Sequence, residues 1–479
     1  MSNLRTLLQN SALSLVTVLM GRVSASIAFI LVARILGPAE SGTYALGIAF
    51  AAVGSAVTLW GLDQVLVRDV ASDRKRAVQY IPNFLLVRAI LTALIFLLIA
   101  LVVRWPFAYD HHTSTVILLM SLSILPEGLD DVWQSLFVAY ERIGIPAITS
   151  IATGVGRLIA TFAILKLGGA VEIVALVMVI TSFLRLGIDT WLGLCHLDSR
   201  LGPLSLRFCS AQLREAFPFL FAGVCIVIRG QGDTILLSLL LSEHDVGLYR
   251  GALTIVTAAI LIPQAFRVAA LPTMSRLHRE SHDAFEQMYQ RSMFYLFLVA
   301  LPMVITLFML AEPILVWLYG TAFAPAAGAL RVLSLGLLFE FLLVPNMRAL
   351  IVTHRQQIAA RAQGLGTLVA IILTVVLVQT ARIVGSAAAR VIAAAVLFFS
   401  SHRYVSEHIS YFVLLNHAWR PLLSVALVAI VFFLIGSRLP VIITVALGGI
   451  LYLGGLFLFH ALPQEDWRRF RKLFHATTK

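Results

Sequence analysis

Arginines in the middle of apolar stretches are the residues of this chain whose chemistry is most informative. Arg22 lies inside the first apolar run, with Ser26 one helical turn further on. Arg229, Gln231 and Asp233 lie in the same way inside a later run. A charge inside a bilayer costs roughly 3 kcal/mol even on the lenient insertion scale, so it needs a partner, a water-filled cavity or a function. Arginine suits phosphate binding, because its planar guanidinium binds two oxygens at once and keeps its charge.

Two of these charges have a simpler interpretation, in which they neutralise each other within one helix. Arg229 and Asp233 are four residues apart, and residues at this spacing share a helix face. Arg185 and Asp189 have the same spacing. Arg22 has no acid at helical spacing, so it is the strongest candidate for a functional cation.

Acidic and amide side chains gather in one later apolar run, directly after Pro126: Glu127, Asp130, Asp131 and Gln134. Three of them, all except Asp130, fall on one helix face, and so many polar groups cannot face lipid. They either pair with Arg157 or Arg88 on neighbouring helices or titrate as a proton-coupling site. Glu340 is a separate, lone acid in the middle of another run.

The elements that carry these charges must be membrane-spanning helices. The 479 residues are 60% hydrophobic and 13% charged, with a mean hydropathy of +0.93, which is too much apolar surface for a soluble core to bury. Roughly fourteen runs are long enough to cross a bilayer. Period-two alternation is absent, so we expect an all-α integral membrane protein without strands. The first run is too long for the core of a signal peptide and is predicted to be retained.

The expected spans are separated by short polar breaks and lie near residues 11–34, 43–66, 82–103, 114–139, 145–166, 170–194, 216–241, 246–271, 291–318, 325–351, 358–379, 384–402, 419–436 and 440–461. Arginines and lysines concentrate in alternate loops, which explains the net charge of +12 without a nucleic-acid partner. This asymmetry predicts that both termini and the 68–76 loop are cytoplasmic. Three scattered cysteines predict neither a metal site nor a disulfide framework.

The stretch 20–71 is repeated once in the second half of the chain. Its polar hinge, between two apolar helices, aligns without gaps with residues 241–249, so that Gly42 matches Gly247 and Tyr44 matches Tyr249. Glycine supplies the tight turn, and the tyrosines are expected at the membrane boundary with wet hydroxyls. The repeat predicts two pseudo-symmetric lobes of about six helices each.

The resulting domain prediction has four parts. An N-lobe over residues 1–197 is followed by a basic, amphipathic cytoplasmic linker over 198–216. A C-lobe covers 217–402, and residues 403–479 hold two further helices and a basic cytoplasmic tail. Such pseudo-symmetry is what alternating access needs.

Motifs spread over most of the chain resemble those of one family. They are Arg34-x-Leu36-Gly37-Pro38-x-x-x-Gly42-x-Tyr44, Gly61-Leu62 with Arg68 and Ala71, Trp133-Gln134 with Glu141-Arg142, Leu271-Pro272-x-x-Ser275-Arg276-Leu277, and Glu312-x-Ile314-x-x-x-Leu318-Tyr319-Gly320-x-x-Phe323-x-x-Ala326-Ala327-x-x-Leu330-Arg331-x-Leu333-Ser334. The last two are the most specific. The chain resembles the Wzx-type lipid-linked oligosaccharide flippases, a polysaccharide-biosynthesis family of the multidrug/oligosaccharidyl-lipid/polysaccharide exporter superfamily.

The resemblance implies a flippase, not an enzyme, that turns polyprenyl-diphosphate-linked oligosaccharide across the bacterial cytoplasmic (inner) membrane for O-antigen, capsule or exopolysaccharide synthesis. It implies a cation-lined cavity in which Arg22, Arg229, Ser26 and Gln231 would hold the diphosphate. The candidates for coupling to an H⁺ or Na⁺ gradient are Asp233, Asp131, Glu127 and Glu340. Membrane lipids and the polysaccharide polymerase and export machinery are the implied partners, and no other cofactor or metal is expected.

Two alternatives remain open at this point. A multidrug antiporter of the same superfamily would have an anionic, aromatic cavity, and Arg22 and Arg229 count against it. A membrane glycan polymerase or ligase would need a sizeable outer loop, and the largest one here, 104–114, is too small. Its two histidines, His111 and His112, are interpreted as solvated loop residues.

Overall fold

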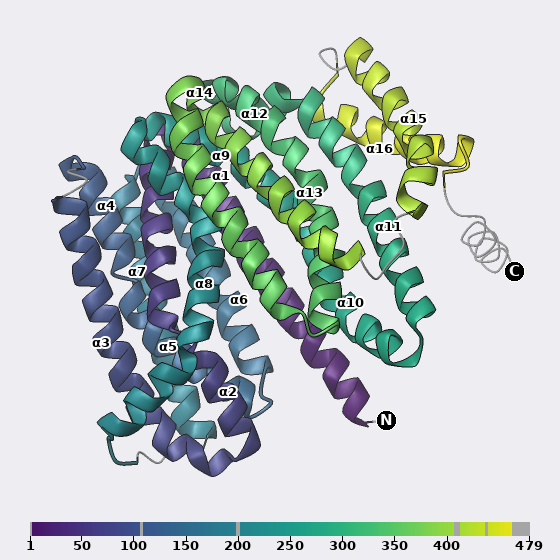
Figure 1. Cartoon of the computed structure of the whole chain (residues 1–479). Coiled ribbons are helices and arrows are strands. Elements are labelled where there is room, and N and C mark those ends of the chain that lie inside the picture. The colour runs from purple at the N-terminus through teal and green to yellow at the C-terminus, as the bar shows by residue number, and fades with distance from the viewer. Residues whose placement is uncertain (1, 106–108, 198–201, 407–411, 436–438, 462–479) are drawn as a thin grey trace, which may run out of the picture. The chain divides into compact units, whose positions relative to one another are not determined.

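The computed structural model describes residues 2–105, 109–197, 202–406, 412–435 and 439–461, and these residues form helices joined by short turns, with no strand among them (Figure 1). Within these ranges, ten helices are long and apolar enough to cross a membrane. The predicted all-α membrane fold is therefore confirmed, and the protein is a multi-pass membrane protein.

The chain forms two compact units, which we describe separately: a first unit of Met1–Thr254 with Thr367–Ala389, and a second unit of Ile255–Gly366 with Arg390–Lys479. The first contains α1 (Ser2–Leu59), α2 (Leu62–Ser72), the 3₁₀ helix η1 (Arg74–Arg76), α3 (Ala77–Arg104), α4 (His111–Ser121), α5 (Ile124–Ala139), α6 (Gly144–Lys166), α7 (Val171–His196) and α8 (Leu206–Leu240). The predicted division into lobes at 197 and 217 stays a prediction.

The second unit contains α10 (Leu261–Glu280), α11 (His282–Met309), α12 (Ala311–Tyr319), the 3₁₀ helix η2 (Thr321–Ala326), α13 (Ala327–Val352), α15 (Phe412–Ile435) and α16 (Val441–Leu458). Two helices, α9 (Glu243–Ala259) and α14 (Gln356–Ser406), have residues in both units.

Backbone breaks divide the longest helices where the sequence predicts separate spans. α1 is interrupted at Gly37, whose φ of 85° and ψ of −176° are not helical, and Pro38 follows. Glycine adopts this positive φ without the strain that a side chain would bring. α14 is interrupted at Ala381 and Arg382, between the spans predicted at 358–379 and 384–402.

One predicted span is divided in a way that the sequence analysis did not expect. The run 114–139 forms two helices, α4 and α5, with the break at residues 122–123. The cause is Pro126 in the first turn of α5, because proline lacks the N–H that a continuous helix would need there.

The predicted linker 198–216 is docked onto α3 by Asn83. Its side-chain amide donates to the Pro203 carbonyl oxygen (3.1 Å), and its side-chain oxygen accepts from the Ser205 N–H (2.8 Å). Ser205 caps α8, which runs without a break through the predicted linker boundary at 216. Residues 198–201 of the linker lie outside the described residues.

Each unit has its own apolar core. In the first, Tyr80 and Phe84 of α3 pack with Trp133 and Phe137 of α5. In the second, helices α10, α11 and α13 supply most of the core, and α15 and α16 pack against each other.

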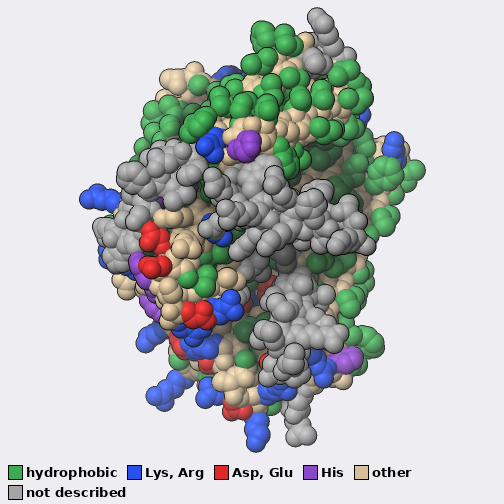
Figure 2. All heavy atoms as spheres, turned by 90° about the vertical axis from the view of Figure 1, so that its right-hand side faces the viewer, with side chains coloured by type: hydrophobic (Ala, Val, Ile, Leu, Met, Phe, Trp, Pro, Cys, Tyr) green, Lys and Arg blue, Asp and Glu red, His purple; other side chains and the backbone are tan. Residues whose placement is uncertain are grey.

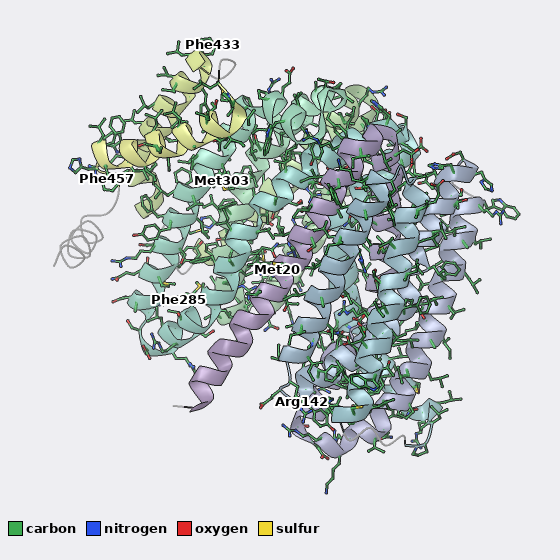
Figure 3. The ribbon with its side chains drawn as sticks, turned by 180° about the vertical axis from the view of Figure 1, so that it is seen from behind. Met20, Arg142, Phe285, Met303, Phe433 and Phe457 are labelled. Carbon is green, nitrogen blue, oxygen red and sulfur yellow. The ribbon has the colours of Figure 1, made fainter. Side chains whose placement is uncertain are left out.

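Apolar side chains also cover the outside, as a membrane protein requires. Phe433 of α15 is 81% exposed, and Phe457 of α16 is also exposed (Figure 3). Figure 2 shows hydrophobic side chains gathered over one end of the face that it displays, with arginines and acids concentrated at the other.

Candidate functional site

The first half of α1 carries Arg22 and Ser26. Arg22 is exposed and Ser26 is half-buried. Both follow Met20, which Figure 3 labels, along α1. α1 packs against α6 and α8, and α8 carries Arg229. The two helices that the sequence aligns as repeats are thus neighbours in the first unit.

The polar residues of α8 bind side chains of α9. Asp233 accepts a hydrogen bond from the Tyr249 hydroxyl (2.6 Å) and another from the Thr234 N–H (2.8 Å). Gln231 Oε1 accepts from Arg250 Nη1 (3.0 Å). The structure therefore adds Arg250 to this group.

The expectation of a wet tyrosine hydroxyl is wrong at Tyr249. Its side chain is fully buried, and its hydroxyl is used inside the protein by Asp233. A half-buried carboxylate needs donors more strongly than a tyrosine needs the interface, because unpaired charge away from water is costly. The α8–α9 hairpin could have suggested this contact, since residues on either side of a tight turn face each other.

Glu127 of α5 binds hydroxyl groups rather than a cation. It accepts from Ser182 Oγ (3.1 Å) and from Ser55 Oγ (3.5 Å). Arg157 donates to the hydroxyls of Thr181 (2.9 Å) and Ser182 (3.4 Å), so Ser182 lies between the arginine and the acid.

Asp131 has Arg88 of α3 as its strongest attractive electrostatic partner. Arg88 is 1% exposed, and its Nη1 donates to the Thr58 carbonyl oxygen (2.8 Å). Of the two cations that the sequence offered to Asp131, Arg88 is the one that interacts with it electrostatically.

The sequence analysis missed the tightest ion pair of this region. Arg185 Nε of α7 lies 2.9 Å from Asp130 Oδ2 of α5 and 3.8 Å from Asp189 Oδ2. One guanidinium therefore bridges two buried carboxyls, and only the weaker contact, with Asp189, follows from helical spacing. Asp189 also accepts from Gln134 Nε2 and from Thr149 Oγ1 (3.3 Å).

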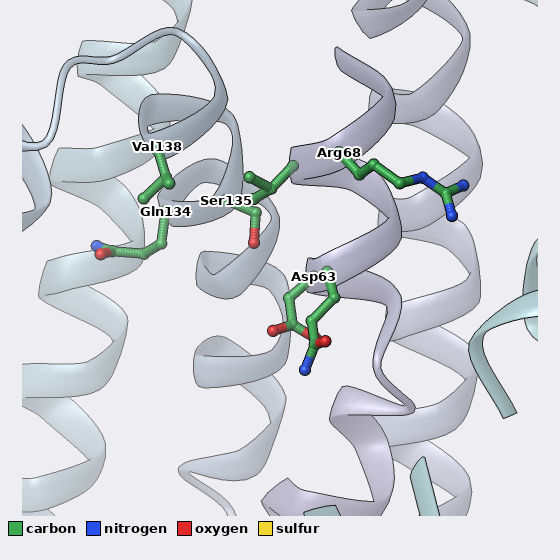
Figure 4. Close-up of a pocket in the computed structure, with 7 residues that line it drawn as sticks. Asp63, Arg68, Gln134, Ser135 and Val138 are labelled. Carbon is green, nitrogen blue, oxygen red and sulfur yellow. The ribbon is translucent and has the colours of Figure 1, made fainter. Parts of the chain in front are cut away.

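An open cavity of about 500 Å³ lies beside these acids, between α2 and α5 (Figure 4). Asp63, Gln64, Val67 and Arg68 line it from α2, and Gln134, Ser135 and Val138 line it from α5. In Figure 4 the Ser135 hydroxyl turns toward Asp63, whereas the Gln134 amide extends away from α2. Gln134 thus borders the cavity and binds Asp189.

Ion pairs between α2 and α8 lie at the rim of this cavity. Arg68 contacts Asp69 Oδ1 (2.7 Å) and Glu215 Oε1 (2.6 Å), and the Tyr80 hydroxyl donates to Asp69 Oδ2 (2.5 Å). Burial opposes ionisation of Asp69, but these hydrogen bonds outweigh it and lower the pKa of the carboxyl. Because Arg68 is exposed to solvent, we assign these ion pairs a role in orienting the side chains at the cavity rim.

The histidine prediction is wrong for His112. The structure places both histidines in the first turn of α4, not in a loop. His112 Nε2 lies 3.0 Å from Glu172 Oε1 and 3.6 Å from Glu40 Oε2, because the start of α4 meets α7 and the α1 hinge here. Across the described residues no cluster of histidine, cysteine and acids suits a metal ion.

The second unit holds Glu340, half-buried in the middle of α13. The same unit has an apolar groove of about 750 Å³. Residues lining it come from α9, α10, α11, α12 and α16 and include Ile255, Met303, Trp317, Ile442 and Gly449.

These features define a class: a multi-pass helical membrane protein whose spans bury a network of arginines and acids. A family model described as "Polysaccharide biosynthesis protein" matches residues 7–278, and the chain belongs to this family. No curated protein matches the chain in sequence.

Solved structures share the fold. One is a lipid II flippase, MurJ, in an inward closed conformation, with a TM-score of 0.77 and 16% identity over 93% of this chain and 98% of that one. Another is an inward-facing multidrug resistance MATE transporter of the MOP superfamily, with a TM-score of 0.68 and 14% identity over 81% and 95%. A MOP superfamily transporter from Pyrococcus furiosus has a TM-score of 0.57 and 14% identity over 84% and 95%.

Proposed function

We propose that the protein is a flippase that moves polyprenyl-diphosphate-linked oligosaccharide across the bacterial cytoplasmic membrane during polysaccharide biosynthesis. The family assignment supports the pathway, and the fold, which a lipid II flippase shares, supports the transport of a lipid-linked glycan. The protein would turn the substrate from the inner to the outer leaflet, with both termini in the cytoplasm.

The observation that carries the proposal is the exposed guanidinium of Arg22 on an apolar spanning helix. An arginine kept at this depth needs an anionic ligand, a partner or water. A diphosphate presents pairs of oxygens that match the two-pronged guanidinium. Arg229, Ser26 and Gln231 belong to the same proposed site, and Arg250 joins it through its hydrogen bond to Gln231.

The three parts of the substrate have different needs. The glycan stays in water, the diphosphate binds the arginines, and the polyprenyl chain stays in an apolar medium. The apolar groove of the second unit has the chemistry that an isoprenoid chain requires. Alternating access by the two repeats would expose the diphosphate site to each side in turn, driven by an H⁺ or Na⁺ gradient.

Substitution of Arg22 tests the proposal. Arg22→Ala should abolish delivery of the lipid-linked glycan to the outer leaflet, whereas Arg22→Lys should retain part of it, because a point charge still attracts phosphate but loses the second hydrogen bond. Delivery would be measured as glycan accessible to an impermeant probe in cells or proteoliposomes. Arg104→Ala is the matched control, since Arg104 is exposed at the end of α3, outside the proposed site.

Full delivery by a well-inserted Arg22→Ala variant would remove Arg22 from the site. The Arg22→Ala strain also tests the alternative function, a multidrug antiporter, because a multidrug resistance MATE transporter shares this fold. An antiporter would lose resistance to cationic drugs when its acids are changed, and Arg22→Ala would leave that resistance intact.

A further inference from the structure

Asp130 on α5 and Asp189 on α7 are buried carboxyls that share one cation, because Arg185 Nε lies 2.9 Å from Asp130 Oδ2 and 3.8 Å from Asp189 Oδ2. Asp189 is 0% exposed and Asp130 is 3% exposed. The ion pairs and hydrogen bonds of these carboxyls are made by their Oδ2 atoms: Arg185 Nε forms ion pairs with both, and Gln134 and Thr149 donate hydrogen bonds to Asp189.

The two Oδ1 atoms are buried and have no hydrogen-bond partner. Two carboxylates beside one guanidinium repel each other, and neither can supply the donor that the other needs while both are ionised. A single proton held between them removes the repulsion and provides the missing donor. The two unsatisfied Oδ1 atoms therefore indicate that the carboxyls hold a proton.

The charges of the surrounding helices lead to the same result. Arg185 on α7, Arg88 on α3 and Arg157 on α6 contribute three positive charges. Four acids face them: Glu127, Asp130, Asp131 and Asp189. At the rim, Asp63 also interacts with Asp131, and Arg68 is held by Asp69 and Glu215. One proton on the buried acids balances the three arginines.

Water can reach this pair from the cavity between α2 and α5. Gln134 lines that cavity (Figure 4) and also donates to Asp189, so its side chain connects the cavity with the buried carboxyls. A change of its rotamer would open Asp189 to the cavity. The proton would then pass to water, leaving two carboxylates against the single guanidinium of Arg185.

We propose that Asp130 and Asp189 form a proton-binding site, in which the two carboxyls share one proton that exchanges with cavity water past Gln134. This site differs from the coupling candidates Asp131, which interacts electrostatically with Arg88, and Glu127, which accepts from serine hydroxyls. Its use in driving transport rests on the flippase function proposed above. The shared proton itself does not.

Infrared spectroscopy of the purified full-length protein in lipid nanodiscs tests the shared proton without any transport assay. The wild type at neutral pH should show a C=O stretching band of a protonated carboxylic acid. Asp130→Asn and Asp189→Asn should each remove the same band, because the remaining acid then ionises against Arg185. Asp131→Asn, the matched neighbour on α5, should keep it. A band that survives both single substitutions, or is lost in only one of them, overturns the shared site.

Thermal unfolding of the same samples gives a second readout. Asparagine reproduces the neutral member of the pair, so each single variant should melt at the wild-type temperature. The double variant leaves the half-buried Arg185 without the two acids that contact it and should melt clearly lower. Single variants that unfold like the double one would show that both acids are ionised, which contradicts the proposal.

Hydrogen–deuterium exchange of the band tests the path. Transfer into D₂O should shift the carboxyl band faster in Gln134→Ala than in the wild type. Ser135→Ala, which changes another residue lining the cavity, should leave the rate unchanged. Equal rates in Gln134→Ala and the wild type would exclude Gln134 as the barrier. The proton site and the flippase function are tested separately. If the carboxyl band behaves as expected but the protein proves not to be a flippase, the proton site still holds.

Discussion

At the scale of single residues, the partners of the buried charges decide what each charge can do. The sequence predicted Glu127, Asp131 and Gln134 of α5 on one face and offered Arg88 as a partner for Asp131, with which it interacts. It did not predict the partner of Asp130. Arg185 pairs most closely with Asp130, which lies on a different helix. Helical spacing predicts contacts within one helix, whereas this contact depends on how α5 and α7 are rotated against each other.

Arg88 provides the residue-scale prediction. It is buried and interacts electrostatically with Asp131, so Arg88→Gln should leave this half-buried carboxylate without that cation. Breaking a buried ion pair from one side typically costs about 3–5 kcal/mol. The variant should therefore unfold at a clearly lower temperature in detergent, and the double variant with Asp131→Asn should recover much of the loss.

Arg157→Gln is the control for this experiment, because Arg157 donates to the hydroxyls of Thr181 and Ser182. Loss of hydrogen bonds to neutral groups should cost less than loss of an ion pair. A wild-type melting temperature for Arg88→Gln, or no recovery in the double variant, would mean that Asp131 does not depend on Arg88.

At the scale of elements, the two copies of the repeated hinge pack directly against each other. A Cβ atom added to Gly42 would lie 1.9 Å from the Glu243 carbonyl oxygen, and one added to Gly247 would lie 1.8 Å from the Pro38 carbonyl oxygen. The α1 hinge and the start of α9 therefore meet backbone to backbone. The sequence predicted the turn at each glycine but not this contact, because a repeat reveals equivalent segments and not their distance.

Valine at either glycine should separate the two hinges. Gly42→Val and Gly247→Val should expose Ser41, which is fully buried in this contact. A Ser41→Cys probe, in a background without the native cysteines, should react with a soluble maleimide in both valine variants and resist it otherwise. Gly156→Val is the control, since a Cβ there meets nothing within 4 Å. A probe that stays unreactive in folded Gly42→Val protein would show that the hinge contact tolerates a side chain.

Element boundaries were the least predictable feature at this scale. Hydropathy located the apolar runs, because each run must satisfy its backbone inside the membrane as a helix. It could not show that the run 114–139 divides at residues 122–123, since apolar residues continue across the break. The sequence signal for this break was Pro126, but a hydropathy average over the run does not reveal a single proline.

At the scale of the whole molecule, composition alone was sufficient to predict an all-helical membrane protein. The chain has more apolar surface than a soluble core can bury, and exposed residues such as Phe433 carry that excess. Topology is a different property, because it depends on which loops carry positive charge and not on how helices pack. The basic segment Arg74–Arg76 and the α3–α4 connection are predicted to lie on opposite sides of the membrane.

Single-cysteine labelling in intact cells checks this topology. Lys75 and His111 are both exposed in the structure and lie on the two sides predicted to differ. In a background without the native cysteines, Lys75→Cys should resist an impermeant thiol reagent and His111→Cys should react with it. After the membrane is permeabilised, both should react, which verifies that each site is accessible. His111 is preferred to His112 because His112 contacts Glu172 and Glu40. Reaction of Lys75→Cys from outside intact cells would invert the orientation, and with it the direction of transport that we propose.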